Sequence, residues 1–153
     1  MGRVSTPPFS SSVYSARLER ASALAAEAGL DAVVVGPGPD LQYLVGVEGD
    51  TIERLTALVI GPGVAPTVVV PRMELAKVRS TAVGTLGLAV SDWVDGENPY
   101  DLVATAVGSA ARVGVSDALP ALHVVPIGER LGVRLELATP VLREGRMLKD
   151  AAE

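Results

Sequence analysis

The chain has 153 residues, a mass of 15.7 kDa and a formal net charge of −5, with no cysteine and one histidine. This length suits one domain with a complete core. The lack of cysteine excludes disulfides, thiolate zinc sites, iron–sulfur clusters and a cysteine nucleophile, and one histidine excludes every multi-histidine metal site. The acidic balance, without a cluster of lysine and arginine, argues against a nucleic-acid partner.

The composition favours an α/β protein without a membrane partner. Apolar residues make up 48% of the chain but aromatic residues only 3%, so Val, Leu, Ile and Ala must fill the core. Such a core suits β-branched strands covered by alanine-rich helices. The uncharged stretch 55–71 contains Gly61, Pro62, Gly63 and Pro66, which exclude a spanning helix. Because the N-terminus has no apolar run of signal-peptide length, we expect a cytoplasmic protein.

The first half of the chain predicts a helix, a buried strand and a hairpin. Apolar residues recur every three or four positions over 14–28, the pattern of an amphipathic helix. Residues 30–35 are almost continuously apolar, as in a central strand covered on both faces. A short helical turn is expected over 40–47. The β-branched runs 55–60 and 67–70 flank a Gly/Pro-rich connection and should pair antiparallel.

The second half alternates between helical and strand patterns. In chain order it first predicts a surface helix over 72–80, a strand over 86–90 and an acidic loop over 92–98. A helix over 99–111 follows, with Tyr100, Val103, Ala104, Val107 and Ala111 on its buried face. The remaining elements are a strand over 112–115, a helix over 119–131 interrupted at Pro126, a strand over 133–137 and an exposed helix over 141–153. This order predicts a three-layer α/β fold, a mixed sheet of about six strands with helices on both faces.

A glycine-rich turn follows the first predicted strand, as in the loops that bind dinucleotides. Gly36 and Gly38 have the required spacing, but Leu41 occupies the place of the third glycine. Pro37 and Pro39 lack the N–H groups that would hold a pyrophosphate. We therefore expect a structural turn and no nucleotide cofactor.

The acidic segment around Trp93 does not have the pattern of a calcium loop. Asp92, Asp95 and Glu97 supply carboxylates, but Trp93 and Val94 break the alternation of oxygen ligands that an EF-hand loop needs. We expect a loop of solvated charges at this position.

No residue of the chain has a sequence context that indicates catalysis. Ser109 lacks the G-x-S-x-G pattern of a nucleophile elbow, and His123 lies between apolar neighbours, as packed histidines do. Trp93 and Tyr100 are either core residues or contacts to a partner. We assign no catalytic, cofactor-binding or metal-binding residue, and expect a binding or assembly role beside an active site located elsewhere.

Several segments, in order, resemble the N-terminal domain of the creatinase, prolidase and Xaa-Pro aminopeptidase family, the pita-bread metallopeptidases. They are YSARLERASALAAEAGLDAVVV, DLQYLVGV, TALVI with PTVVVPRMELAKV, WVDGENPYDLV, RVGVSD and VLREGRMLKDAAE. The resemblance covers about residues 13–153 and is most specific at Tyr43-Leu44-x-Gly46 and at Arg146-Met147-Leu148-Lys149 with Glu153. The chain departs from the family pattern at Asp40, Val45, Val47 and Gly145.

The resemblance implies a division of the chain and a role. A polar tail over 1–12 would precede the domain at 13–139, and 140–153 would begin a linker helix into a C-terminal catalytic domain. That domain would bind two divalent metals, Mn, Co or Zn, whose ligands cannot be placed on this sequence. Substrates in the family are Xaa-Pro peptides or, in creatinase, a non-peptide.

The expected function is that of a non-catalytic N-terminal domain of an Xaa-Pro dipeptidase- or aminopeptidase-like metallohydrolase. It would supply contacts for a homodimer and shape access to the active site. Tyr43, Trp93, Tyr100 and His123 are the candidate interface or site-entrance residues. The alternative is a stand-alone module that binds a small molecule or a protein and lacks the catalytic half.

Overall fold

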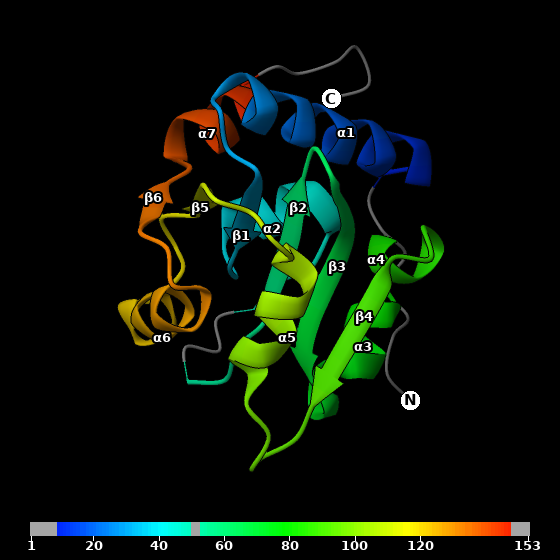
Figure 1. Ribbon diagram of the computed structural model, residues 1–153. Coiled ribbons are helices and arrows are strands. Elements are labelled where there is room, and N and C mark those ends of the chain that lie inside the picture. Colours follow the sequence, from blue (N-terminus) through cyan, green and yellow to red (C-terminus); the bar gives the residue numbers. More distant parts are fainter. Residues whose placement is uncertain (1–8, 50–52, 148–153) are drawn as a thin grey trace.

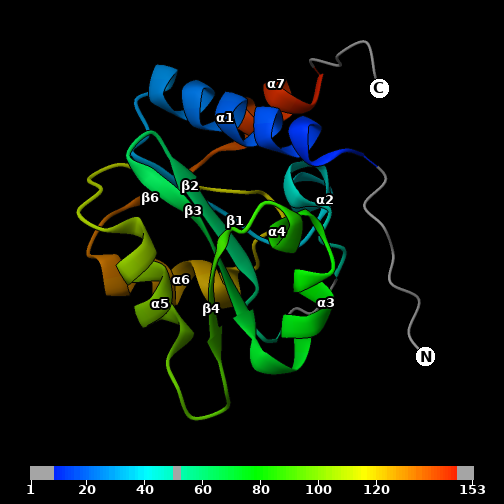
Figure 2. The same cartoon turned by 90° about the vertical axis from the view of Figure 1, so that its right-hand side faces the viewer.

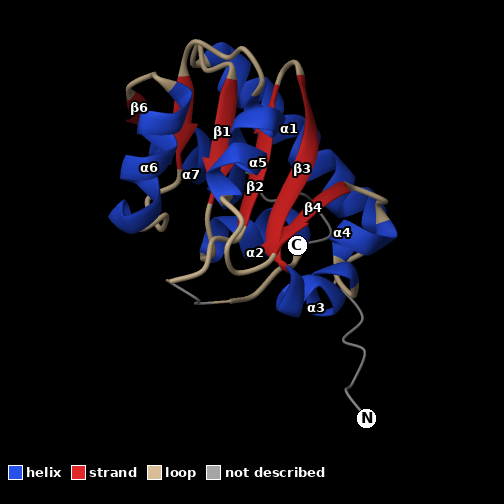
Figure 3. Cartoon of the chain, turned by 60° about the horizontal axis from the view of Figure 1, so that its bottom comes forward, coloured by secondary structure: helices blue, strands red, loops and turns tan. Residues whose placement is uncertain are grey.

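The computed structural model describes residues 9–49 and 53–147, where six strands form one sheet between two layers of helices (Figure 1). The strands are β1 (Ala32–Val35), β2 (Ala57–Gly61), β3 (Val64–Pro71), β4 (Ala89–Trp93), β5 (Val113–Val115) and β6 (Leu135–Leu137). They lie side by side in the order β4-β3-β2-β1-β5-β6 (Figure 3). β2 runs antiparallel to β1 and β3, and the other neighbouring pairs are parallel. The predicted mixed sheet and hairpin are confirmed.

Helices cover both faces of the sheet. They are α1 (Ser11–Glu27), α2 (Pro39–Val45), the 3₁₀ turn η1 (Arg72–Glu74), α3 (Leu75–Arg79), α4 (Ala82–Thr85), α5 (Pro99–Val107), α6 (Ala121–Leu131) and α7 (Thr139–Met147). The helices α1 to α4 and α7 pack on one face, and α5 and α6 pack on the other (Figure 2). The three-layer α/β class expected from the sequence is confirmed.

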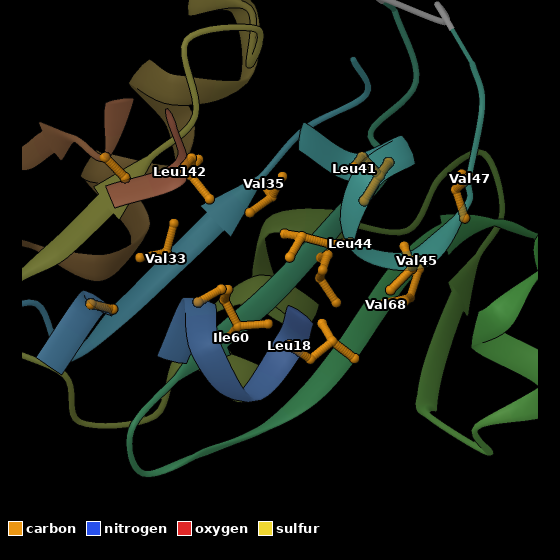
Figure 4. Packing of buried hydrophobic residues seen from close by; sticks show 14 of the residues in the cluster. Leu18, Val33, Val35, Leu41, Leu44, Val45, Val47, Ile60, Val68 and Leu142 are labelled. Atoms are coloured by element: carbon orange, nitrogen blue, oxygen red, sulfur yellow. The ribbon is translucent and has the colours of Figure 1, made fainter. Parts of the chain in front are cut away.

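β1 is the central strand, and its sequence explains its position. All four of its residues are buried, with Val33 and Val35 facing the α1 layer and Ala32 and Val34 facing the α5 layer. A strand covered on both faces needs apolar residues throughout, because side chains alternate between the faces. Figure 4 shows Val33 and Val35 directed toward the same core as Leu142 of α7.

Glycines end several helices. α1 is followed by Gly29 with φ +76°, and α2 ends at Gly46 with φ +73°, both in the left-handed region expected at a helix C-terminus. Gly108, with φ +68°, follows α5 at Val107. This helix therefore stops earlier than predicted, and Ala111, expected on its buried face, is exposed.

The prediction for the segment after α3 is wrong in its details. A short helix, α4, occupies 82–85, and β4 starts at Ala89 instead of residue 86 and continues to Trp93. Asp92 and Trp93 therefore belong to the sheet and not to a loop. Pairing with the long strand β3, in which Pro71 lies opposite Trp93, extends β4 beyond what its own sequence indicates.

Pro126 does not interrupt α6, contrary to the prediction. The helix continues from Ala121 to Leu131 with Pro126 inside it. Proline removes one backbone hydrogen bond. His123 and Ile127, one turn apart, are both buried on the sheet side of the helix, and this packing holds the two turns together.

The closing helix α7 is buried along one side, which corrects the expectation of an exposed helix for residues up to 147. Val141, Leu142 and Gly145 are buried, and α7 packs against α1 and α2. The rest of the predicted helix, 148–153, lies outside the described residues. So do residues 1–8 of the predicted tail, and α1 begins at Ser11, inside the range assigned to that tail.

Candidate functional site

The four candidate contact residues lie on opposite faces of the sheet. Tyr43 is on α2, in the layer that contains α1 and α7. Trp93, Tyr100 and His123 belong to the layer of α5 and α6. The structure therefore does not bring all four together, and each group needs a separate description.

Tyr43 connects three helices. Its hydroxyl donates a hydrogen bond to the carbonyl oxygen of Gly145 in α7 over 2.9 Å, and its own carbonyl accepts one from Arg17 in α1 over 2.8 Å. The Arg17 guanidinium lies 4.0 Å from the centre of the Tyr43 ring. These contacts tie α1, α2 and α7 to one another.

Arg17 is a charged side chain on the buried side of α1, with only 6% of its surface exposed. Its guanidinium also lies 4.6 Å from the ring centre of Phe9 and 5.5 Å from that of Tyr14. A guanidinium over aromatic faces is favourable, more so when shielded from water. Burial raises the pKa of Tyr14 above its ordinary value, and the Arg17 charge opposes this rise.

Asp40 forms a second contact between α2 and α7. Its Oδ1 lies 2.8 Å from Nε of Arg146, and Asp40 is only 8% exposed. Burial raises the pKa of Asp40, the Arg146 charge opposes the rise, and the carboxylate of Asp117 adds to it. Asp117 in turn accepts a hydrogen bond from the Thr139 hydroxyl at the start of α7.

This junction of α1, α2 and α7 is closely packed. The cavity that it encloses has a volume of about 10 Å³ and is lined by residues of the three helices, Arg17, Tyr43, Asp40 and Arg146 among them. Such a space holds at most about one water molecule. The junction is therefore a contact between helices and not a substrate pocket.

Tyr100 and His123 form a pair between α5 and α6. The Tyr100 hydroxyl lies 2.9 Å from Nδ1 of His123, which is 3% exposed. Burial raises the pKa of Tyr100. An ion pair of 2.6 Å between Arg130 and Asp101 joins the same two helices nearer to solvent. The pair thus lies within the contact between the helices.

Trp93 is buried in the core beside α5. Its Nε1 donates a hydrogen bond to the carbonyl oxygen of Leu55 over 3.0 Å. A buried indole with its N–H satisfied is typical of a core residue. In this chain Trp93 therefore has little surface to offer to a partner.

The glycine-rich turn after β1 packs against the turn after β5. The Gly36 amide donates to the Ser116 hydroxyl over 2.9 Å in a buried contact. A Cβ on Gly36 would lie 3.1 Å from Cα of Leu119, and one on Gly38 would lie 2.9 Å from Cβ of Ala118. These glycines permit close contact between the two turns, as expected for a structural role.

An open groove with a volume of about 780 Å³ lies beside α5. Small neutral side chains such as Thr67, Ala89 and Ser91 line much of it, and the charge among its lining residues is that of Asp31. The Asp31 carboxylate accepts hydrogen bonds from the amides of Ala111 and Arg112, 3.0 Å each. The groove has space for a ligand, and its charged lining residue is bound to backbone amides.

The described part of the chain lacks a metal centre and a membrane span. Among these residues no group of three or more His, Cys, Asp or Glu is placed to hold an ion. In the same residues no helix combines the length and apolar character needed to cross a bilayer. The two divalent metals implied by the resemblance therefore do not fit this part of the chain.

The grouping of Arg17, Asp40 and Arg146 was not predicted from the sequence. One signal was available, because Arg17 falls on the same helical stripe as Tyr14, Leu18 and Ala21. The approach of Asp40 to Arg146 depends on how α7 folds back over α2, and local sequence carries no sign of it.

The fold and these contacts define a three-layer α/β domain in which the buried charged residues Arg17 and Asp40 connect helices. Residues 17–148 match the family described as Creatinase/Prolidase N-terminal domain. The chain belongs to this family, and the resemblance stated from its sequence is confirmed.

Relatives of known name support the same conclusion. Mycobacterium tuberculosis has a protein named "Probable dipeptidase PepE" that is 49% identical over 146 residues, or 95% of this chain. The crystal structure of dipeptidase PepE from Mycobacterium ulcerans is 50% identical with a TM-score of 0.88. Each of these two matches spans 95% of this chain and 39% of the length of the relative.

A proline dipeptidase from Streptococcus pneumoniae gives a further structural match. It is 25% identical with a TM-score of 0.74, and the match covers 86% of this chain and 98% of that one. Almost the whole of that crystallised chain therefore has the architecture described here.

Proposed function

We propose that this chain acts as the non-catalytic N-terminal domain of a metal-dependent Xaa-Pro dipeptidase- or aminopeptidase-like hydrolase. The observation that carries the proposal is the similarity to a protein named as a dipeptidase, which is 49% identical over 95% of this chain. The match spans only 39% of that protein. Catalysis would then belong to the remaining part of such a protein. We further propose that the protein works in the cytoplasm.

The chemistry of two-metal hydrolysis supports this division. Such sites hold two ions roughly 3.5–4 Å apart with converging carboxylates and histidine. In residues 9–49 and 53–147 the only histidine is His123, and its Nδ1 faces the Tyr100 hydroxyl. We therefore assign the binding of Mn, Co or Zn, and the activation of water, to the catalytic domain.

The proposed contribution of this domain is contact between subunits and control of access. Large apolar side chains at Leu122 and Val125 of α6 and at Leu137 of β6 are 55%, 58% and 69% exposed. Exposed apolar side chains that form a contiguous patch often mark an interface between proteins. They support the proposal of a homodimer, with α6 and β6 as the contacting elements.

The test is a comparison of the chain with the product of its whole reading frame. Residues 1–153 alone should not hydrolyse Ala-Pro or Gly-Pro with added Mn²⁺, Co²⁺ or Zn²⁺. The whole product should hydrolyse them, and a chelator should abolish the activity. Turnover by residues 1–153, lost on His123→Ala and on chelation, would contradict the proposal.

A stand-alone binding module is the second candidate, favoured by the groove of about 780 Å³ beside α5. Its volume is within the range of roughly 300–1,000 Å³ typical of ligand pockets. A reading frame that stops at codon 153 would support this candidate. A frame that continues with two aspartates, a histidine and two glutamates at metal-ligand spacing would support the peptidase.

A further inference from the structure

α7 is held by polar contacts at its C-terminal end as well as by apolar packing. Near this end, the Gly145 carbonyl accepts a hydrogen bond from the Tyr43 hydroxyl over 2.9 Å, and Arg146 lies 2.8 Å from Asp40. Both partners belong to α2, which is only seven residues long. One short helix therefore contacts two successive residues of α7.

These contacts differ from ordinary surface ion pairs. The Asp40 side chain is 12% exposed and the Arg146 side chain 39%, with Oδ1 and Nε themselves shielded from solvent, whereas the side chains of Arg130 and Asp101 between α5 and α6 are 50% and 57% exposed. Taking a carboxylate and a guanidinium out of water is costly, so a buried pair adds little net stability. Removing Arg146 leaves the Asp40 carboxylate buried without its partner, and a displacement of α7 is disfavoured for the same reason.

Arg17 supports the α2 side of this contact. It donates to the Tyr43 carbonyl over 2.8 Å and lies under the Tyr43 ring at 4.0 Å. The ring is thus fixed in the position from which its hydroxyl reaches Gly145. The contact therefore depends on α1 as well as on α2 and α7.

We propose that Asp40 and Tyr43 latch the end of α7 onto α1 and α2, and so set the direction in which the polypeptide leaves this domain. The inference rests on the proposed function, since it makes Asp40 and Tyr43 positioning residues for the metal-binding part of the protein. Neither residue touches the reacting atoms. They act through the orientation of α7.

The first experiment tests the latch without any enzymatic assay. Hydrogen–deuterium exchange over 139–147 is followed in residues 1–153 carrying Asp40→Asn or Tyr43→Phe. Exchange near the end of α7 should become about tenfold faster with Asp40→Asn, as loss of a buried charge-assisted contact implies. Asp101→Asn, which breaks the matched pair with Arg130, should leave α7 exchange unchanged.

A double variant separates the pair from a general loss of stability. Arg146→Gln leaves the buried Asp40 carboxylate without its partner, and Asp40→Asn leaves the Arg146 guanidinium without its partner, but together the two changes remove both charges. Exchange in the double variant should therefore be slower than the two single effects combined predict. The proposed latch would be contradicted if the two single effects on exchange were additive. It would also be contradicted if Asp40→Asn increased the exchange rates of α7 and α5 equally.

The second experiment uses the product of the whole reading frame. Asp40→Asn and Tyr43→Phe should raise KM for Ala-Pro by about threefold or more, with kcat per metal-loaded enzyme within about twofold, because access is altered and chemistry is not. A lower kcat at unchanged KM would contradict the positioning role. If the wild-type product had no dipeptidase activity, the proposed function would be contradicted. The exchange measurement would still show whether Asp40 and Tyr43 hold the end of α7.

Discussion

Asp31 shows how a single exposed carboxylate stabilises a connection between distant strands. It precedes β1, and its Oδ2 accepts hydrogen bonds from the amides of Ala111 and Arg112 at the start of β5. These two amides, the Arg112 amide first, lower the pKa of Asp31 below its ordinary value, and the Arg112 charge adds to the effect. The carboxylate is therefore favoured in the folded chain.

We expect Asp31→Asn to make the chain less stable at neutral pH. Because the folded-state pKa lies below 3.8, the ionised carboxylate stabilises the fold above that pH. This stabilisation is lost as the pH falls through the lower, folded-state pKa. Urea unfolding of both proteins at several pH values should give curves that converge below about pH 4. A constant difference from neutral to acidic pH would contradict the assignment.

Gly36→Ala should destabilise the fold by about 1–3 kcal/mol, the usual cost of forcing an extra carbon into a packed site. The added Cβ would lie 3.1 Å from Cα of Leu119 and 2.9 Å from its Cδ1. Gly63→Ala is the matched control, since a Cβ there would meet nothing within 4 Å. Thermal unfolding of both variants measures the difference, and equal melting temperatures would refute the packing argument.

At the scale of elements, α7 and α6 show where packing overrides local signals. α7 contains Gly145, which lowers helix propensity, yet the helix continues to Met147 because Val141 and Leu142 are buried against the neighbouring layer. α6 continues through Pro126 for a similar reason. Glycine and proline both disfavour a helix interior, and the contacts that keep these two helices continuous come from elsewhere in the chain.

Gly145→Ala should stabilise the chain by up to about 1 kcal/mol, the helix-propensity difference between glycine and alanine. A Cβ at this position would lie 3.6 Å from Cδ1 of Leu24 in α1, an ordinary contact. Gly84→Ala in α4 should have the opposite effect, because the added Cβ would clash with the carbonyl oxygen of Arg79. Urea midpoints should therefore move in opposite directions. A lower midpoint for Gly145→Ala would show that α7 needs glycine there.

At the scale of the whole molecule, β4 and β6 are the outer strands of the sheet, and the apolar residues of α6 and β6 remain exposed. Edge strands and exposed apolar side chains are the features through which chains associate. This arrangement is the physical basis for the proposed homodimer.

We expect sedimentation velocity to show concentration-dependent self-association of residues 1–153. Leu122→Ser combined with Val125→Ser should shift the chain toward monomer, because it removes two exposed apolar side chains from α6. Met73→Ser is the control, because it changes an even more exposed apolar side chain after β3, and it should leave the association unchanged. A wild-type chain that stays monomeric at high protein concentration would argue against a strong role in dimer formation.

The sequence alone determined the class, the order of the main elements, the central position of β1 and the family, because these depend on hydrophobic periodicity, glycines at turns and the order of short segments. It did not determine α4, the length of β4, the continuity of α6 or the burial of α7, since pairing and packing with distant residues decide them. The junction of Arg17, Asp40, Tyr43 and Arg146 belongs to this second group. Its residues lie far apart in the chain, and only the folding of α7 over α1 and α2 brings their charges and hydrogen-bonding groups together.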